Sequence, residues 1–374
     1  MSVDLSTLSL YPATPEQKIE ARRRTQHEWG RGLTLEEHLA RDAAQEEMEG
    51  SLGGKFITWV LVPRESPTSM DIKCACETFA RTGLVYEPSD NSTKTVPCYA
   101  IASVFTPAEH RGKGFARHMM RLMHWVLADE SFLPNDAFPS AKWGAPPPKV
   151  DGLRNGWFSA LWSDVGTLYA SCGPFPGQEG GWVIRGTTTA LWDVHALPSL
   201  ESDGAWTWLD NAGVSKLWEE DSELIRNELP ASNHLSIAFT PEVGVASFQH
   251  RRLDIYLDKV KDRPQTWGVV SADRGTYATW TIDPRPPVVR MTITRLRTTR
   301  DAFPGVFAKV VELARRHDVK TIEVWGLSEE LLAGAKELGA KVSEREEHLS
   351  AFKWYGKGTE EDIQWAFNER FAWC

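Results

Sequence analysis

The sequence predicts a mixed α/β (α+β) protein built from two units of similar length. The chain has 374 residues, which is more than one hydrophobic core usually fills at roughly 100–200 residues per domain. Hydrophobic residues make up 41% of it and 17 tryptophans are spread along it, an apolar load that a disordered chain does not carry. Short apolar runs alternate with amphipathic stretches in both halves. We expect one domain over residues 1–187 and another over 188–374.

The first 50 residues are expected to be helical. Thr14 precedes a proline and an acidic turn, which is typical of a helix start, and the stretch to Met48 is rich in Glu, Ala, Arg and Leu. Gly30 and Gly32 divide this stretch into two helices. Apolar runs bounded by Pro, Gly, Ser or Asn then predict three strands, at residues 56–63, 72–78 and 99–106.

A strongly periodic segment at residues 115–128 predicts a long amphipathic helix. The proline-rich residues 138–150 predict a loop or lid, and residues 158–162 predict another strand. A short helix is expected to end near Cys172 and Gly173, where glycine suits a left-handed cap.

The second half is expected to begin with a helix at residues 206–225. Strands, helices and further strands follow, in an order that loosely resembles the first half. The expected strands are 235–239, 267–271, 277–282, 288–297, 321–325 and 350–355, and the expected helices are 302–317 and 329–338.

Charge and cysteine content narrow the class of partner. The formal net charge of −9 argues against broad binding to nucleic acid or to anionic membranes. No apolar run approaches the roughly 18–20 residues that span a bilayer, and the polar start does not resemble a signal peptide. The odd count of five cysteines indicates a reducing, cytoplasmic environment. Cys74 and Cys76 have no His/Cys pair nearby at ligand spacing, so we expect no metal.

The segment at residues 100–127 carries the strongest functional signal. An apolar strand leads into a glycine-rich basic loop, which leads directly into the amphipathic helix. The first turn of a helix has unpaired N–H groups that bind phosphate. Gly112 and Gly114 let the backbone approach a pyrophosphate, and Arg111, Lys113 and Arg117 add positive charge. The loop lacks the G-x-x-x-x-G-K-[ST] pattern of a P-loop, and Arg117 replaces the small residue of a dinucleotide fingerprint.

The pattern that fits is R/Q-x-x-G-x-G/A, here Arg111-x-x-Gly114-x-Ala116, which resembles the acetyl-CoA loop of the GNAT superfamily of N-acetyltransferases. The resemblance implies a mixed, mostly antiparallel sheet flanked by helices, followed by a second GNAT-like unit without this loop. It also implies that the loop holds the pyrophosphate and that the preceding strand end offers backbone groups to the acetyl and pantetheine portions. The implied acetyl-CoA-binding residues are Val104, Phe105, Thr106, Arg111, Gly112, Lys113, Gly114, Phe115 and Ala116.

Two residues are candidates for proton transfer. Tyr169 and Gly173 resemble the Tyr-x-x-x-Gly element of the superfamily, in which the tyrosine protonates the departing thiolate. Glu77 lies inside an apolar strand, where desolvation raises a carboxyl pKa towards that of a useful base. The alternatives are a tyrosine that only packs and a glutamate that faces water. Asp164 is interpreted as a helix cap, and His118 and His124 as packing or surface residues.

Wider features are similar to the fungal lysine N-acetyltransferases of lysine catabolism, which implies transfer of acetyl to the side-chain amine of free L-lysine. The features are Cys74-Ala-Cys-Glu-Thr78, the loop and its helix, Trp162 to Tyr169, and the long second unit, which would cover the substrate side. The residues leave two alternatives open. One is another amine acceptor, namely a polyamine or a protein or peptide amine, and the other is a non-catalytic acyl-CoA-binding module. The sequence does not indicate an oligomeric state.

Overall fold

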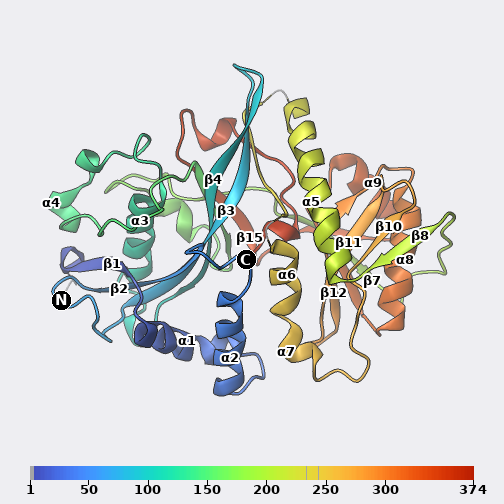
Figure 1. The fold of residues 1–374 in the computed structure, drawn as a ribbon, viewed down its shortest axis with the longest axis horizontal. Helices are drawn as coiled ribbons and strands as arrows, with labels where there is room; N and C mark the ends of the chain where they lie inside the picture. The colour runs from blue at the N-terminus through green and yellow to red at the C-terminus, as the bar shows by residue number, and fades with distance from the viewer. Residues whose placement is uncertain (1–3, 233, 243) are drawn as a thin grey trace.

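The protein contains two mixed sheets with helices packed against both, as a computed structural model shows for residues 4–232, 234–242 and 244–374 (Figure 1). Most neighbouring strands are antiparallel. The parallel pairs in this part of the chain join residues 98–101 to 158–161, 290–293 to 321–324, and 236–237 to 364–365. The predicted fold class, a mostly antiparallel mixed sheet followed by a second α/β unit, is confirmed.

The first sheet has a path of seven strands and a branch of two. The path runs β1 (Leu8–Pro12), β2 (Phe56–Pro63), β3 (Cys74–Glu87), β4 (Ser92–Phe105), β5 (Phe158–Ser163), β15 (Leu349–Trp354) and β6 (Val183–Ile184). The branch starts at the C-terminal end of β3, where β9 (Ser236–Phe239) pairs with residues 83–86, and β16 (Gln364–Trp365) pairs with β9. The sheet therefore takes strands from both halves of the sequence, and the division at residues 187/188 stays a prediction.

The second sheet lies on the other side of the molecule (Figure 1). Its strand order is β14 (Lys341–Glu344), β7 (Thr188–Asp193), β13 (Thr321–Trp325), β12 (Arg290–Arg297), β11 (Tyr277–Asp283), β10 (Gly268–Ser271) and β8 (Trp206–Leu209). The α-helices among the described residues are α1 (Pro15–Trp29), α2 (Leu35–Glu46), α3 (Phe115–Leu127), α4 (Ser140–Trp143), α5 (Asn211–Glu228), α6 (Val245–Arg251), α7 (Asp254–Leu257), α8 (Phe303–Arg316) and α9 (Glu329–Glu337).

Local signals explain most of these elements. Thr14 and Thr34 each accept a hydrogen bond from the third residue of α1 and α2 in a capping box, and the chain turns between the two helices at the predicted glycines. The helix predicted at 206–225 is partly wrong, because Trp206–Leu209 form β8. Asp210 then caps α5, so the true helix start lies one turn later.

A buried ionic cluster ties the C-terminal segment to the second sheet. Asp221 of α5 pairs with Arg295 and Arg297 of β12, and Arg295 also pairs with Glu369. Glu369 accepts a further hydrogen bond from the Leu296 backbone N–H at 2.8 Å. These contacts fix the residues that follow Glu369, including the short 3-10 helix Arg370–Ala372, between the two sheets.

Candidate functional site

The predicted phosphate loop has the backbone shape that the prediction requires. Gly112 and Gly114 have φ angles of +75° and +82°, in the left-handed region that favours glycine. No described atom lies within 4 Å of the position where a Cβ of Gly112 would stand, and near Gly114 the nearest is Leu5 Cδ1 at 4.0 Å. Gly114 is the N-cap of α3 and has no side chain, so among the described residues no side-chain cap covers the first-turn N–H groups. The loop therefore presents an open, positively polarised helix start, which fits a pyrophosphate.

The basic residues of the loop are exposed and held by nearby groups. The Arg111 Nε donates to the Thr106 carbonyl at 3.0 Å, and its guanidinium also pairs with Glu28 of α1. Lys113 Nζ donates to the Glu109 carbonyl at 2.7 Å. An arriving pyrophosphate would compete with Glu28 for the Arg111 guanidinium, which is exposed enough to exchange partners.

The strand pair β4–β5 opens beside this loop. Its parallel pairing ends at Ile101–Leu161, although β4 continues to Phe105 and β5 to Ser163. The two strands therefore separate, and the backbone of β4 beyond Ile101 is free of β5. The predicted contacts of Val104, Phe105 and Thr106 fall on this separated end, where main-chain groups are available to an extended amide-bearing chain.

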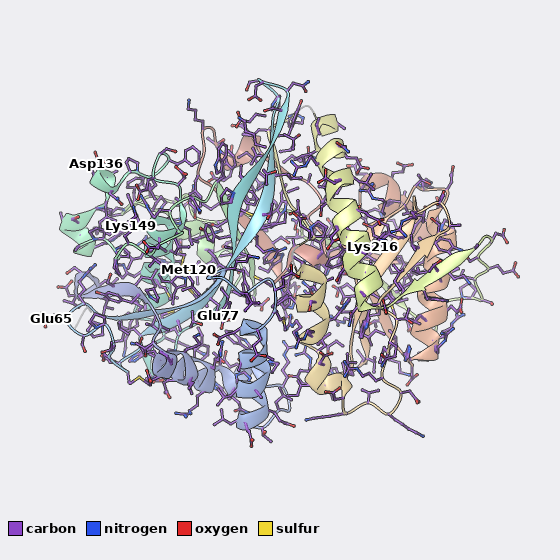
Figure 2. The ribbon with its side chains drawn as sticks, viewed as in Figure 1. Glu65, Glu77, Met120, Asp136, Lys149 and Lys216 are labelled. Carbon is purple, nitrogen blue, oxygen red and sulfur yellow. The ribbon has the colours of Figure 1, made fainter. Side chains whose placement is uncertain are left out.

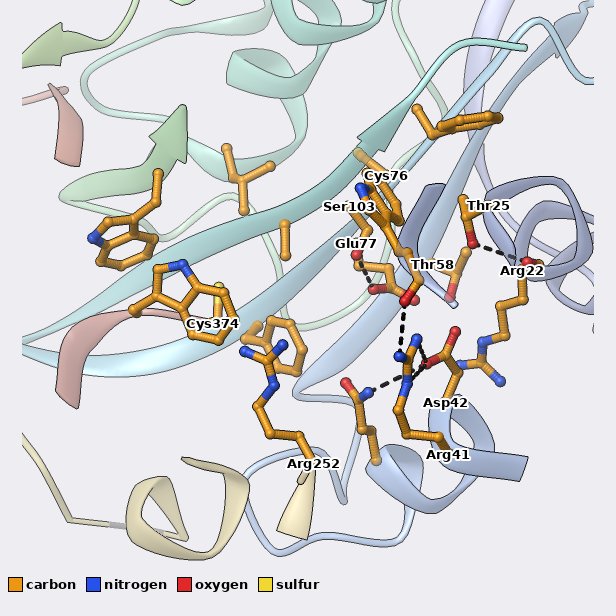
Figure 3. A pocket seen from close by; sticks show the side chains of 18 of the residues that line it. Arg22, Thr25, Arg41, Asp42, Thr58, Cys76, Glu77, Ser103, Arg252 and Cys374 are labelled. Carbon is orange, nitrogen blue, oxygen red and sulfur yellow. Dashed lines mark hydrogen bonds and ion pairs between the residues drawn. The ribbon is translucent and has the colours of Figure 1, made fainter. Parts of the chain in front are cut away.

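A β-bulge turns the predicted base towards a cavity. The register between β3 and β4 shifts between Ala75 and Glu77, and Ser103 opposite has a φ of +54°. The Ser103 hydroxyl donates to Glu77 Oε2 at 2.7 Å (Figure 3). Burial, with Asp42 nearby, raises the pKa of Glu77, and the effects of Arg22 and Ser103 are too small to reverse it. The interpretation of Glu77 as a desolvated carboxyl is thereby supported, and its role as a base stays a prediction.

Glu77 lines a cavity of about 230 Å³ near the centre of the molecule (Figures 2 and 3). The cavity extends from the separated strands β4 and β5 to helices α1 and α2. Its other walls come from the second half of the chain. Its lining includes the side chains of Asp42, Glu77, Ser103, Phe105, Arg252, Arg370 and Trp373.

Tyr169 lies outside the set of residues that line this cavity. It is on the short 3-10 helix Leu168–Ser171, buried in the cluster that packs around α3. Burial raises the pKa of its phenol, and the nearby Cys74, Cys172, Cys76 and Asp164 act in the same direction. Tyr169 is thus a protonated phenol near Cys74 and Cys76 of β3 and near Asp164, which follows β5. The structure does not bring its side chain and Glu77 to the same cavity.

Other titratable residues have structural contacts. His124 stacks on Trp182 with 4.2 Å between ring centroids, and its Nε2 lies 2.7 Å from the Cys172 carbonyl oxygen. The packing interpretation of His118 and His124 is confirmed, since both are buried. Asp164 does not cap the following helix; it accepts a hydrogen bond from the His348 backbone N–H at 2.7 Å. It joins the end of β5 to the second half of the chain.

Sequence reasoning missed the residues that the second half adds to the cavity. Arg252 follows α6, and Arg370 and Trp373 lie in the C-terminal segment. Arginine and tryptophan are common in this half, so neither residue type nor spacing distinguishes these positions from their neighbours. Asp42 was missed for a similar reason, because on a helix rich in acidic residues it looks like part of a solvated face.

The described residues contain neither a candidate metal centre nor a candidate membrane span. No group of three or more His, Cys, Asp or Glu side chains in that part of the chain is arranged to hold a metal ion. Nor does any helix among the same residues combine the length and the apolar composition needed to cross a bilayer.

Comparison with known proteins identifies the fold and the C-terminal half. Residues 194–374 match the family model described as the LYC1 GNAT-like C-terminal domain. A curated Yarrowia lipolytica protein named lysine acetyltransferase is 30% identical over 182 residues, which is 48% of this chain and 41% of that protein. The matched segment thus spans about two fifths of the length of that relative.

Solved structures resemble nearly the whole chain. A GCN5-related N-acetyltransferase from Kribbella flavida is 15% identical with a TM-score of 0.52, and the match covers 93% of this chain and 72% of that one. A probable N-acyltransferase from Enterococcus faecalis V583 is 11% identical with a TM-score of 0.54 over the same shares. At these identities the likeness shows the fold. The chain therefore has the GNAT fold, and its residues 194–374 match the model of the LYC1 GNAT-like C-terminal domain.

Proposed function

We propose that the protein is an acetyl-CoA-dependent N-acetyltransferase that acetylates the side-chain amine of free L-lysine. The observation that carries this proposal is the central cavity, in which a buried carboxylate lies at the separated ends of β4 and β5, the strands next to the phosphate loop. The cavity volume of about 230 Å³ is below the roughly 300–1,000 Å³ of typical drug-sized sites, so it suits a small amine. The relative named lysine acetyltransferase supports the choice of lysine.

Each predicted residue has a task in this reaction. Residues 111–116 and the start of α3 hold the pyrophosphate, and the separated end of β4 orients the acyl-bearing arm. Bound acetyl-CoA supplies the activated thioester. Glu77 accepts the proton that the substrate ammonium must lose before its nitrogen attacks the thioester carbonyl. Tyr169 donates a proton to the departing thiolate; burial keeps its phenol protonated and also makes the phenol a weaker acid.

A substrate panel tests the proposal. Acetyl-CoA is mixed separately with free amino acids, polyamines and peptides, and thiol release is followed. The proposal expects the highest kcat/KM with L-lysine. Strong turnover of peptides or polyamines with none for lysine would overturn the choice of substrate. Acetyl-CoA binding without turnover of any amine would instead favour the non-catalytic acyl-CoA-binding module.

A further inference from the structure

Arginine and tryptophan side chains alternate along one side of the cavity. The Arg252 guanidinium carbon lies 4.0 Å from the Trp373 ring centroid, and that of Arg370 lies 3.8 Å from the same centroid. Arg370 is also 4.4 Å from the centroid of Trp325, on which Arg345 stacks at 3.7 Å. We call these five residues the Arg–Trp ladder. Arg252, Arg370 and Trp373 line the cavity, whereas Trp325 and Arg345 are not among its lining residues.

The two arginines in the cavity wall have no anionic partner. Among residues 4–232, 234–242 and 244–374, neither the Arg252 nor the Arg370 side chain forms an ion pair or a hydrogen bond, and Arg370 Nε is a buried donor without an acceptor. Three other arginines of the cavity are paired: Arg22 contacts Glu46 at 2.7 Å, Arg41 contacts Asp42 at 2.7 Å, and Arg285 pairs with Asp283. Arg31, which also lines the cavity, is exposed to solvent. Arg345 donates to backbone carbonyls, including that of His348 at 2.9 Å.

The surroundings of Arg252 and Arg370 make an anion favourable there. Burial and then the positive charge of Arg370, Arg285 and Arg41 lower the pKa of Arg252 well below its usual value. Burial also lowers the pKa of Arg370, to about 9. A buried guanidinium without a counter-charge loses hydration without compensation, so an anion in the cavity stabilises both groups.

The geometry of stacking specifies what kind of anion fits. A guanidinium that stacks on indole keeps its N–H donors in its own plane, where a carboxylate binds in a bidentate manner. Arg252 extends from the end of α6 into the pocket, towards the strands that carry Glu77 (Figure 3). The cavity therefore has the unpaired guanidinium groups of Arg252 and Arg370 on the wall from the second half of the chain. The wall from the first half carries the carboxylates of Glu77 and Asp42 together with the side chains of Arg22, Arg31 and Arg41.

We propose that Arg252 and Arg370 bind the α-carboxylate of the amine substrate, so that the acceptor is a free amino acid rather than a polyamine or a residue within a peptide. This inference rests on the proposed acetyltransferase function and adds the residues that select the substrate. Cadaverine is lysine without its carboxylate and lysinamide is lysine with a neutral carboxamide, so they isolate the contribution of the charge.

The experiment compares kcat/KM for L-lysine, lysinamide and cadaverine in the wild type, Arg252→Met and Arg370→Met. Loss of a charge-assisted bidentate contact is expected to lower kcat/KM for L-lysine by about 10²-fold, mainly through KM. The values for lysinamide and cadaverine should change by less than about 3-fold. Arg345→Met is the matched control, because it removes a member of the same ladder that lies outside the cavity. It should lower Tm and leave the ratio of lysine to cadaverine turnover unchanged.

The outcomes separate this inference from the proposed function. Equal losses of kcat/KM for lysine and for cadaverine in Arg252→Met and Arg370→Met would show that the arginines only support the fold, and would overturn the inference. A wild type that acetylates cadaverine as efficiently as lysine would also overturn it. If no amine is acetylated, the proposed function fails. Calorimetric titration with L-lysine and with cadaverine then still tests the carboxylate site, and equal heats would overturn it. If the Met variants do not fold, Arg252→Lys and Arg370→Lys keep the charge and should still weaken lysine selectivity by about 10-fold.

Discussion

Replacing Gly114 by alanine tests the phosphate loop with a small perturbation. The new methyl group has room, because the nearest described atom, Leu5 Cδ1, is 4.0 Å from the Cβ position. The φ of +82° makes a side chain unfavourable there by about 1–2 kcal/mol. The methyl group would also keep a pyrophosphate away from the N–H groups at the start of α3. Losing one or two such charge-assisted hydrogen bonds costs about 3 kcal/mol of binding, or roughly 100-fold in Kd.

Thermal unfolding with and without acetyl-CoA measures both effects. At a ligand concentration of 100 times the wild-type Kd, the ligand stabilises the wild type by about 2.7 kcal/mol, which for a chain of 374 residues is a rise in Tm of roughly 3–4 °C. A 100-fold weaker variant at the same concentration gains about 0.4 kcal/mol, a rise of about 0.5 °C. The larger Gly114→Trp change should abolish the shift entirely.

Gly204→Ala is the matched control for the backbone cost. Gly204 has a φ of +88°, and no described atom lies within 4 Å of its Cβ position. Both alanine variants should lose a similar 1–2 kcal/mol in the absence of ligand, and Gly204→Ala alone should keep the full acetyl-CoA shift. A full shift in Gly114→Ala, or an equal loss in both variants, would refute the assignment of the loop.

Three further predictions concern the acid–base groups and the ionic cluster. Burial raises the pKa of Glu77, so wild-type kcat/KM should decrease at acid pH with an apparent pKa above the usual 4.5. In Glu77→Gln the rate should be about 10²-fold lower, and this acid decrease should be absent from the pH profile. Ionised Glu77 opposes folding above its unfolded pKa, so Glu77→Gln should unfold at higher denaturant at pH 7, and a lower midpoint would contradict this. Tyr169→Phe should lower kcat, measured by thiol release, at least 10²-fold. The rise in Tm on adding acetyl-CoA should stay as in the wild type, and an unchanged kcat would exclude the proton-donor role. Burial favours a higher pKa for Asp221, but its two arginine partners outweigh burial and lower the pKa. The contribution of Asp221 to the free energy of unfolding is therefore present at neutral pH and lost as pH falls through that lowered pKa. Asp221→Asn should cost about 3–5 kcal/mol of stability. Burial raises the pKa of Glu369, so Glu369→Gln should lower the free energy of unfolding in urea at pH 7 by less than Asp221→Asn does. A larger loss for Glu369→Gln would contradict the opposite pKa shifts of the two carboxyl groups.

The sequence predicted those parts of the site that are local in the chain. The loop at residues 111–116 is contiguous, and its glycines, charges and following helix all act within one supersecondary unit. Glu77 could be singled out because an acidic residue in an apolar strand is unusual in itself. The fold class followed from alternating apolar and amphipathic segments, whereas the start of α5 was misplaced because Trp206–Leu209 continue the apolar pattern up to Asp210.

The cavity wall that carries Arg252 and Arg370 could not be predicted from the sequence, for a physical reason. Arg252 and Arg370 reach the same cavity only because α6 and the C-terminal segment, which are far apart in the sequence, come together in the fold. Their distinguishing property is the lack of a carboxylate partner in the described chain, and pairing between distant residues is not visible in a single sequence. Glu369 illustrates this: beside Arg370 in the chain, it looks like a local partner, yet its carboxylate reaches Arg295 and the Leu296 backbone.

The position of β15 has a consequence for how the protein is made. This strand pairs with β5 along its whole length and with β6 on its other side, so residues 349–354 join two parts of a sheet that begins at Leu8. During synthesis the edge of β5 stays open until most of the chain has left the ribosome, and such unpaired edges invite aggregation. We therefore expect slow, late folding of the first sheet and a need for chaperone protection of the nascent chain.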